Sequence, residues 1–133
     1  DVYKRQASYL VDDPEICAAL LTRLRRGNFN CSVVVDKEAF DEKVSRSQRP
    51  RLEELKRGGA AVRLASGYFG GSNFRGSMHM KTVVIDSCVA FTGSANLTKK
   101  ARKNIELVSQ VTGPAVHDIV VGVRHAFSSG SDL

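Results

Sequence analysis

The chain has 133 residues, enough for one domain that buries roughly two-thirds of its unfolded surface, so we expect residues 1–133 to form a single domain. Its 42% hydrophobic and 26% charged residues are typical of soluble globular proteins, and no apolar run reaches the roughly 18 residues that span a bilayer. The net charge of +6 favours polyanionic partners, either nucleic acid or an anionic lipid surface.

The three cysteines, Cys17, Cys31 and Cys88, are widely spaced. This spacing fits neither a disulfide framework nor a zinc site. We therefore expect small buried thiols in a reducing, cytoplasmic compartment. The first residues are followed by no uninterrupted apolar segment, so we expect no secretory signal.

The first half of the chain alternates strand-like and helix-like segments. Residues 2–9 predict a first strand, although with weak patterning. Asp13 and Pro14 are typical of an N-cap and a first helical residue, and Gly27 would end that helix. The β-branched run 31–36 predicts a buried strand. A second helix from Pro50 to the Gly58-Gly59 pair and a strand over residues 61–65 would follow.

The second half begins with a glycine-rich segment, residues 66–78, which contains aromatic side chains and Arg75. It is either a cradle for substrate or a flexible connector, and the sequence leaves both open. Strands are predicted over residues 81–86 and 89–92, around a turn at Ser87 and Cys88, and over residues 106–112.

A last helix is expected to open at Pro114, because apolar residues follow at helical spacing: Val116, Ile119, Val120, Val123 and Phe127. Residues 128–132 would form a frayed tail. Helices and strands therefore interleave along the chain. This order predicts an α/β fold, a mixed β-sheet flanked by helices.

The most informative pattern is His-x-Lys-x4-Asp-x6-Gly-Ser-x-Asn. Its fixed positions are His79, Lys81, Asp86, Gly93, Ser94 and Asn96. A match at so many positions is far more specific than a short motif. The pattern supplies an imidazole that can attack phosphorus, an ammonium that can neutralise phosphate oxygens, and hydroxyl and amide donors that can orient them.

At these residues the chain resembles the phospholipase D superfamily, in particular its small single-motif, endonuclease-like members. The context of the motif, residues 83–86 and 91–98, and the downstream residues 104–106 are similar too. The resemblance implies a phospholipase D-like fold and a phosphodiesterase that forms a phosphohistidine with no metal or other cofactor. Most members build one site from two motifs, so a single motif implies a homodimer.

The chemistry and spacing of the residues, together with the resemblance, predict roles for individual residues. His79, Lys81, Ser94, Asn96 and Glu106 would be catalytic, with Glu106 accepting a hydrogen bond from a ring nitrogen of His79. Asp86, Gly93 and Asn104 would be structural, and Asp86 would pair with a basic group or fix the turn. Basic residues near the motif would bind substrate: Arg75, Lys99, Lys100, Arg102 and Lys103.

We expect the substrate to be nucleic acid, DNA or RNA, and we expect no stable membrane insertion. The sequence leaves three alternatives open: a phospholipid phosphodiesterase of phospholipase D or cardiolipin type, a catalytically weak nucleic-acid-binding module, and half of a longer two-motif protein. The basic segment 43–57 is interpreted as a solvated helix face. His117 and His125 are interpreted as surface or satisfied core residues, since the histidines do not match zinc spacings.

Overall fold

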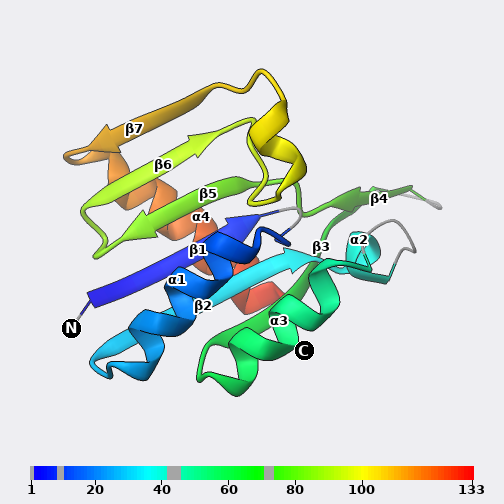
Figure 1. Ribbon diagram of the computed structural model, residues 1–133. Helices are drawn as coiled ribbons and strands as arrows, with labels where there is room; N and C mark the ends of the chain where they lie inside the picture. Colours follow the sequence, from blue (N-terminus) through cyan, green and yellow to red (C-terminus); the bar gives the residue numbers. More distant parts are fainter. Residues whose placement is uncertain (1, 9–10, 42–45, 71–73) are drawn as a thin grey trace.

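The structure is a computed structural model that describes residues 2–8, 11–41, 46–70 and 74–133 (Figure 1). One eight-stranded sheet has the order β4-β3-β2-β1-β5-β6-β7, with β8 paired to β3. The strands are β1 (Val2–Ser8), β2 (Phe29–Asp36), β3 (Ala61–Gly70), β4 (Phe74–Ser77), β5 (Lys81–Ile85), β6 (Val89–Gly93), β7 (Val108–Thr112) and β8 (Ser131–Asp132). The helices are α1 (Pro14–Arg25), α2 (Lys37–Asp41), α3 (Gln48–Arg57) and α4 (Ala115–Ser129), with a 3-10 helix over Lys100–Lys103.

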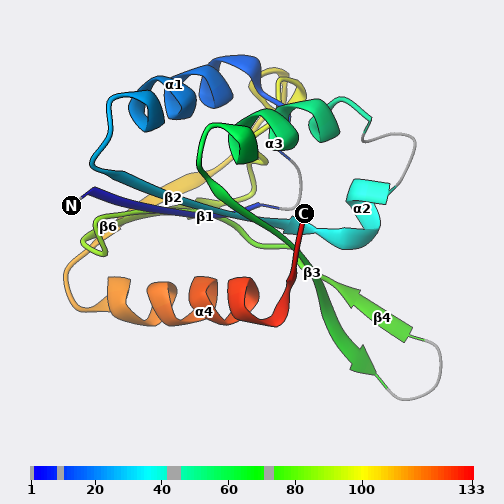
Figure 2. The ribbon, with the colours of Figure 1, turned by 90° about the horizontal axis from the view of Figure 1, so that it is seen from below.

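The sheet lies between two helical layers. Figure 2 shows α1 and α3 on one face and α4 on the other. Successive side chains of β2 alternate between the layers, because a strand points neighbouring residues to opposite faces. Val33 and Val35 belong to the core under α1 and α3, whereas Val34 belongs to the core under α4. The predicted mixed sheet flanked by helices is therefore confirmed.

Two helices are built as their sequences indicate. Asp13 is the N-cap of α1, with its carboxylate accepting from the backbone N–H groups of Glu15 and Ile16, and Pro14 is the first helical residue. Gly27 follows this helix with a φ of 74°, a conformation in which glycine has no steric penalty. In α4, Val116, Val120 and Val123 are buried, so the predicted apolar stripe faces the core.

The glycine-rich segment 66–78 differs from the predicted loop. β3 continues to Gly70 and pairs with β4, so most of the segment is a two-stranded hairpin that projects beyond the helices (Figure 2). Residues 71–73 lie outside the described residues. A Cβ on Gly67 would stand 2.3 Å from the carbonyl carbon of Gly76, so this close approach requires glycine. A glycine that gives flexibility and a glycine that lets two strands approach closely cannot be told apart in a sequence. This is why the sequence did not predict the hairpin.

Two further expectations were wrong, and one short helix was not predicted. The tail does not fray, because Ser131 and Asp132 pair with β3 and the N–H of Leu133 donates to the carbonyl of Val62. The helix that was not predicted is α2.

The cysteines differ in burial. Cys17 and Cys31 are buried free thiols as expected, but Cys88 is exposed beside the β5–β6 turn. Burial raises the pKa of Cys17 to about 11, which keeps that thiol protonated near neutral pH.

Candidate active site

Strand register brings the motif residues other than Asp86 to one end of neighbouring strands. His79 directly precedes β5, whose Thr82 pairs with Thr92 near the end of β6. Gly93, the last residue of β6, pairs with Val108, the first residue of β7. The start of β5, the end of β6 and the approach to β7 therefore lie side by side. Residues far apart in sequence converge there through antiparallel pairing.

His79 and Lys81 are in direct contact. The ammonium nitrogen of Lys81 lies 3.0 Å from Nδ1 and 3.4 Å from Nε2 of His79, and it donates to the His79 carbonyl at 3.1 Å. His79 is exposed and Lys81 is half-buried. Burial lowers the pKa of Lys81, and the charge of Glu106 partly offsets this effect. A phosphoryl group on the imidazole would have its oxygens within reach of this ammonium.

Glu106 is held by two motif neighbours. Ser94 Oγ donates to one carboxylate oxygen of Glu106, and Asn104 Nδ2 donates to the other at 3.1 Å. These two hydrogen bonds and the charge of Lys81 lower the pKa of Glu106, so the carboxylate is ionised near neutral pH. The expected hydrogen bond from His79 to Glu106 stays a prediction. In the structure, Glu106 connects Ser94, Asn104 and the charge of Lys81.

Gly93 and Asp86 have structural surroundings. A Cβ on Gly93 would stand 2.0 Å from the carbonyl oxygen of Leu107, so only glycine lets β6 approach the chain before β7. Asp86 lies in the β5–β6 turn with a φ of 53°, next to Ser87 at 56°. Positive φ at both central residues suits a tight hairpin. At about 3.3 Å per residue, Asp86 is roughly 16 Å along β5 from Lys81.

Asn96 sits half-buried, and its Oδ1 has no hydrogen-bond partner among the described residues. A buried polar atom without a partner is costly and is often satisfied by a ligand. Rotation of the amide by half a turn would present Nδ2, a donor for phosphate, at the same place. The structure does not connect Asn96 to His79 by a hydrogen bond. The side chain of Arg75 lies outside the described part of the chain.

Comparisons with known proteins agree with this geometry. The family model described as cardiolipin synthase, PLD-like domain, matches residues 4–128. The chain belongs to the phospholipase D-like family. The predicted family resemblance is thereby confirmed. No curated protein sequence matches the chain significantly.

Solved structures share the phospholipase D-like fold. Nuc of Salmonella typhimurium, described as a phospholipase D family member, is 23% identical with a TM-score of 0.83, over 98% of this chain and 81% of Nuc. NucT of Helicobacter pylori is 22% identical with a TM-score of 0.86, and the match covers 98% of this chain and 82% of NucT. Phosphatidylserine synthase of Haemophilus influenzae Rd KW20 is 15% identical with a TM-score of 0.64, and the match covers 98% of this chain and 34% of the synthase. At these identities the likeness concerns the fold.

This phospholipase D-like chain also has a supporting residue that the sequence did not reveal. Asp36, at the end of β2, is fully buried. One carboxylate oxygen accepts from the N–H of Ala39 at 2.8 Å, and the other accepts from the N–H of Met78 at 2.7 Å. Met78 directly precedes His79. The buried carboxylate therefore caps α2 and fixes the backbone from which the candidate nucleophile projects.

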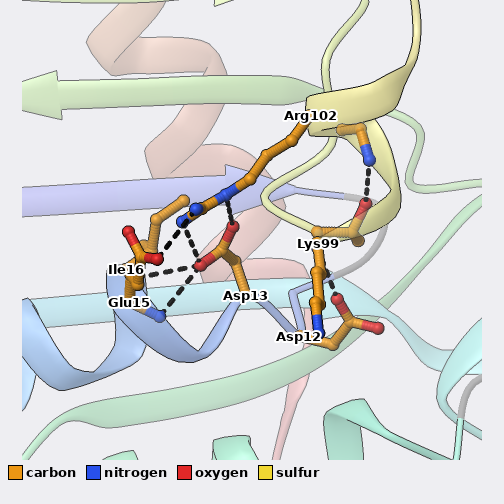
Figure 3. Close-up of polar contacts among 8 residues, drawn as sticks. Asp12, Asp13, Glu15, Ile16, Lys99 and Arg102 are labelled. Atoms are coloured by element: carbon orange, nitrogen blue, oxygen red, sulfur yellow. Dashed lines mark hydrogen bonds and ion pairs between the residues drawn. The ribbon is translucent and has the colours of Figure 1, made fainter.

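A second support holds the segment after Asn96 (Figure 3). Arg102 reaches Asp13 with its Nε at 2.6 Å and its Nη2 at 2.7 Å, and contacts Glu15 at 3.0 Å. The N–H of Lys99 donates to Asp12 at 3.0 Å. The predicted substrate-binding role of Arg102 stays a prediction, but its charge is already paired. Three lysines of the basic cluster are exposed nearby: Lys99, Lys100 and Lys103.

The Asp13→Asn substitution should reveal this ion pair through pH. Burial alone would raise the pKa of Asp13, but hydrogen bonds from Arg102 and from the N–H groups of Ile16 and Glu15 lower it below its ordinary value. The stabilisation is therefore present above the unfolded pKa of about 3.9, and it is lost as the pH falls through the folded pKa. At pH 7 the variant should unfold about 1–3 kcal/mol more easily.

Urea unfolding from pH 7 to pH 2 measures this effect. The difference in free energy of unfolding between wild type and Asp13→Asn should shrink as the pH falls from about 4 through the folded pKa of Asp13, because the carboxyl is protonated first in the unfolded chain and then, below the folded pKa, in both states. Acids far from this ion pair titrate alike in both proteins, so their contributions cancel in the difference. Glu15 does not cancel, because it shares Arg102 with Asp13 and the Asp13 charge raises its pKa. A difference that stays constant with pH would contradict the role given to this carboxylate.

Two further features concern metal ions and membranes. Among the described residues, the His, Cys, Asp and Glu side chains form no group of three or more that could hold a metal ion. Within the same residues, no helix is both long enough and apolar enough to cross a bilayer.

Proposed function

We propose that this chain is a metal-independent phosphodiesterase that cleaves nucleic acid through a covalent phosphohistidine, with its active site shared across a homodimer. The observation that carries the proposal is the grouping of His79, Lys81, Ser94 and Glu106 where β5 begins and β6 ends. It combines a nucleophile that needs no metal with a cation for the phosphate oxygens.

The proposed reaction has two displacements at phosphorus. A ring nitrogen of His79 attacks the phosphodiester, so that an N–P bond forms while the P–O bond to the leaving group breaks. A protonated His79 of the partner subunit gives its proton to the leaving oxygen. Water then attacks phosphorus, passes a proton to that imidazole, and the N–P bond breaks, which restores both histidines.

Lys81 and Glu106 support this chemistry electrostatically. Charge builds on the non-bridging oxygens as phosphorus is attacked, and the Lys81 ammonium lies within 3.4 Å of both ring nitrogens of His79. The ionised Glu106 keeps a negative charge near Lys81, which favours the protonated ammonium. Ser94 and Asn104 hold that carboxylate in place.

The surface beside Glu106 supports a homodimer. Three large apolar residues are exposed there. Their exposed fractions are 104% for Ile105, 76% for Leu107 and 50% for Val108. β7 ends the main strand path, so its outer edge pairs with no further strand among the described residues. An exposed apolar edge strand tends to be covered. A second copy of this chain would cover it and would bring two His79 side chains into one region.

The Ile105→Arg substitution should weaken this dimer at least tenfold in dissociation constant, because it places a charge in the apolar contact. Sedimentation over a concentration series measures the change. Val121→Arg is the matched control, since Val121 is a half-exposed apolar residue that belongs to α4 and not to the exposed β7 edge. A wild-type chain that is fully active as a monomer would exclude the shared site.

A substrate panel tests the function itself. The exposed Lys99, Lys100 and Lys103 and the net charge of +6 support a polyanionic substrate. Purified protein is incubated with labelled DNA, labelled RNA and phospholipid vesicles in excess chelator. Cleavage of DNA or RNA with intact vesicles is expected. Cleavage of phospholipid alone would favour the lipid enzyme, binding without cleavage would favour a binding module, and rescue only by added metal would contradict the mechanism.

A further inference from the structure

A cavity of about 780 Å³ begins at His79 and extends away from the other candidate catalytic residues. It lies between the C-terminal half of α4 and the stem of the β3–β4 hairpin. Of the candidate catalytic residues, His79 is the one that lines it in the described part of the chain. His79 thus contacts Lys81 and also borders the cavity, which Lys81 does not line.

The lining has two kinds of surface. Apolar groups come from Leu64, Met78, Met80 and Ala126, of which Met78 and Ala126 are almost fully buried. Hydroxyl and basic groups complete it: Ser66, Ser77, Ser129, Ser131, Lys37 and His125. The volume falls in the range of roughly 300–1,000 Å³ that is typical of small-ligand sites, and a mixed lining of this kind is typical as well.

We propose that this cavity is a subsite for the nucleoside attached to the reacting phosphate. The inference rests on the proposed function and names the part of the substrate that the cavity binds. A phosphodiester whose phosphorus lies at His79 has two ester groups. Because His79 borders the cavity, one of these groups can enter it. Methionine sulfur and methyl groups pack well against the flat face of a base, and serine hydroxyls suit the hydroxyls and ring oxygen of a sugar.

The charge of the lining favours a nucleoside over a lipid headgroup. Lys37 carries a positive charge at the cavity. It would repel the ammonium of choline or ethanolamine, whereas it would attract the next phosphate of a nucleic-acid chain. The serine hydroxyls of the lining are also poorly suited to an acyl chain, because a hydroxyl that loses its hydration there would gain no partner from the lipid.

Gly122 offers a way to fill the cavity. A Cβ at this position would meet only the terminal methyl of Met80, at 3.7 Å, which is ordinary van der Waals contact. The helix therefore accepts a side chain there, and that side chain would occupy a wall of the cavity. Gly122→Ala and Gly122→Phe give a graded series. Val121→Phe adds bulk at the preceding, half-exposed position of α4 and is the matched control.

The test compares two substrates with the same leaving group, thymidine 5′-(p-nitrophenyl phosphate) and methyl p-nitrophenyl phosphate. The wild type should prefer the thymidyl ester at least tenfold in kcat/KM. That preference should fall partly in Gly122→Ala and nearly to one in Gly122→Phe, and it should persist in Val121→Phe. An unchanged preference in a folded Gly122→Phe protein, judged by circular dichroism, would overturn the subsite.

Equilibrium binding separates this inference from the proposed function. Thymidine 5′-monophosphate should bind the wild type, and Gly122→Phe should weaken that binding at least tenfold, whether or not either ester is cleaved. If both esters resist hydrolysis but this loss of binding is seen, the proposed function fails and the subsite stands. Equal affinity for thymidine 5′-monophosphate and glycerol 3-phosphate would overturn the nucleoside assignment in favour of a lipid headgroup.

Discussion

Replacement of His79 by alanine should reduce kcat/KM for the cleaved nucleic acid by roughly 10⁴-fold or more, because the nucleophile and the proton donor are lost together. The side chain is exposed, so its removal should leave the free energy of unfolding nearly unchanged. Steady-state kinetics on a preparation free of contaminating nuclease, with urea unfolding as the check on folding, measures both effects.

His117→Ala is the matched control, since His117 is also an exposed histidine and lies on α4. It should keep wild-type turnover. If His79→Ala and His117→Ala were equally active, the histidine mechanism would be excluded. If both lost activity alike, the loss would reflect a property other than nucleophilic attack.

The Asp36→Asn substitution should cost about 2–4 kcal/mol of stability, although the two side chains have nearly the same shape. Asp36 accepts from Ala39 and from Met78 with separate oxygens. Asparagine has one oxygen and one NH₂ group, so one buried N–H would face another donor. Urea unfolding measures the loss.

The same substitution should lower kcat by about 10- to 100-fold at temperatures where the protein is folded, because His79 follows the Met78 backbone and small misplacements of a nucleophile are costly. Ala39→Pro separates the two hydrogen bonds, since it removes the donor in α2 and leaves the Met78 bond in place. That control should lose stability with little loss of kcat. Equal loss of kcat in the two variants would contradict a positioning role for Asp36.

Much of the fold was predictable because local signals agreed with the tertiary packing. Asp13, Pro14 and Gly27 mark the ends of α1 by mechanisms that act within a few residues. The apolar stripe of α4 needed only its helical spacing. The hairpin β3–β4 was not predictable, since its glycines serve the close approach of two strands rather than flexibility.

The candidate site divides in the same way. The motif named His79, Lys81, Ser94 and Asn96 from sequence. Its supports depend on contacts across long sequence distances: Asp36 is 42 residues from Met78, and Asp13 is 89 residues from Arg102. Such pairs leave no local pattern, because each residue type has an ordinary local role, Asp36 after a strand and Arg102 in a basic run.

The stereochemical course at phosphorus tests the central claim most directly. A DNA with one phosphorothioate of known configuration at the cleavage site is hydrolysed in ¹⁸O-labelled water, and the configuration of the product is determined. Each in-line displacement inverts phosphorus, so attack by His79 followed by attack by water should give net retention. Net inversion would mean that water attacks directly, and it would contradict the phosphohistidine mechanism.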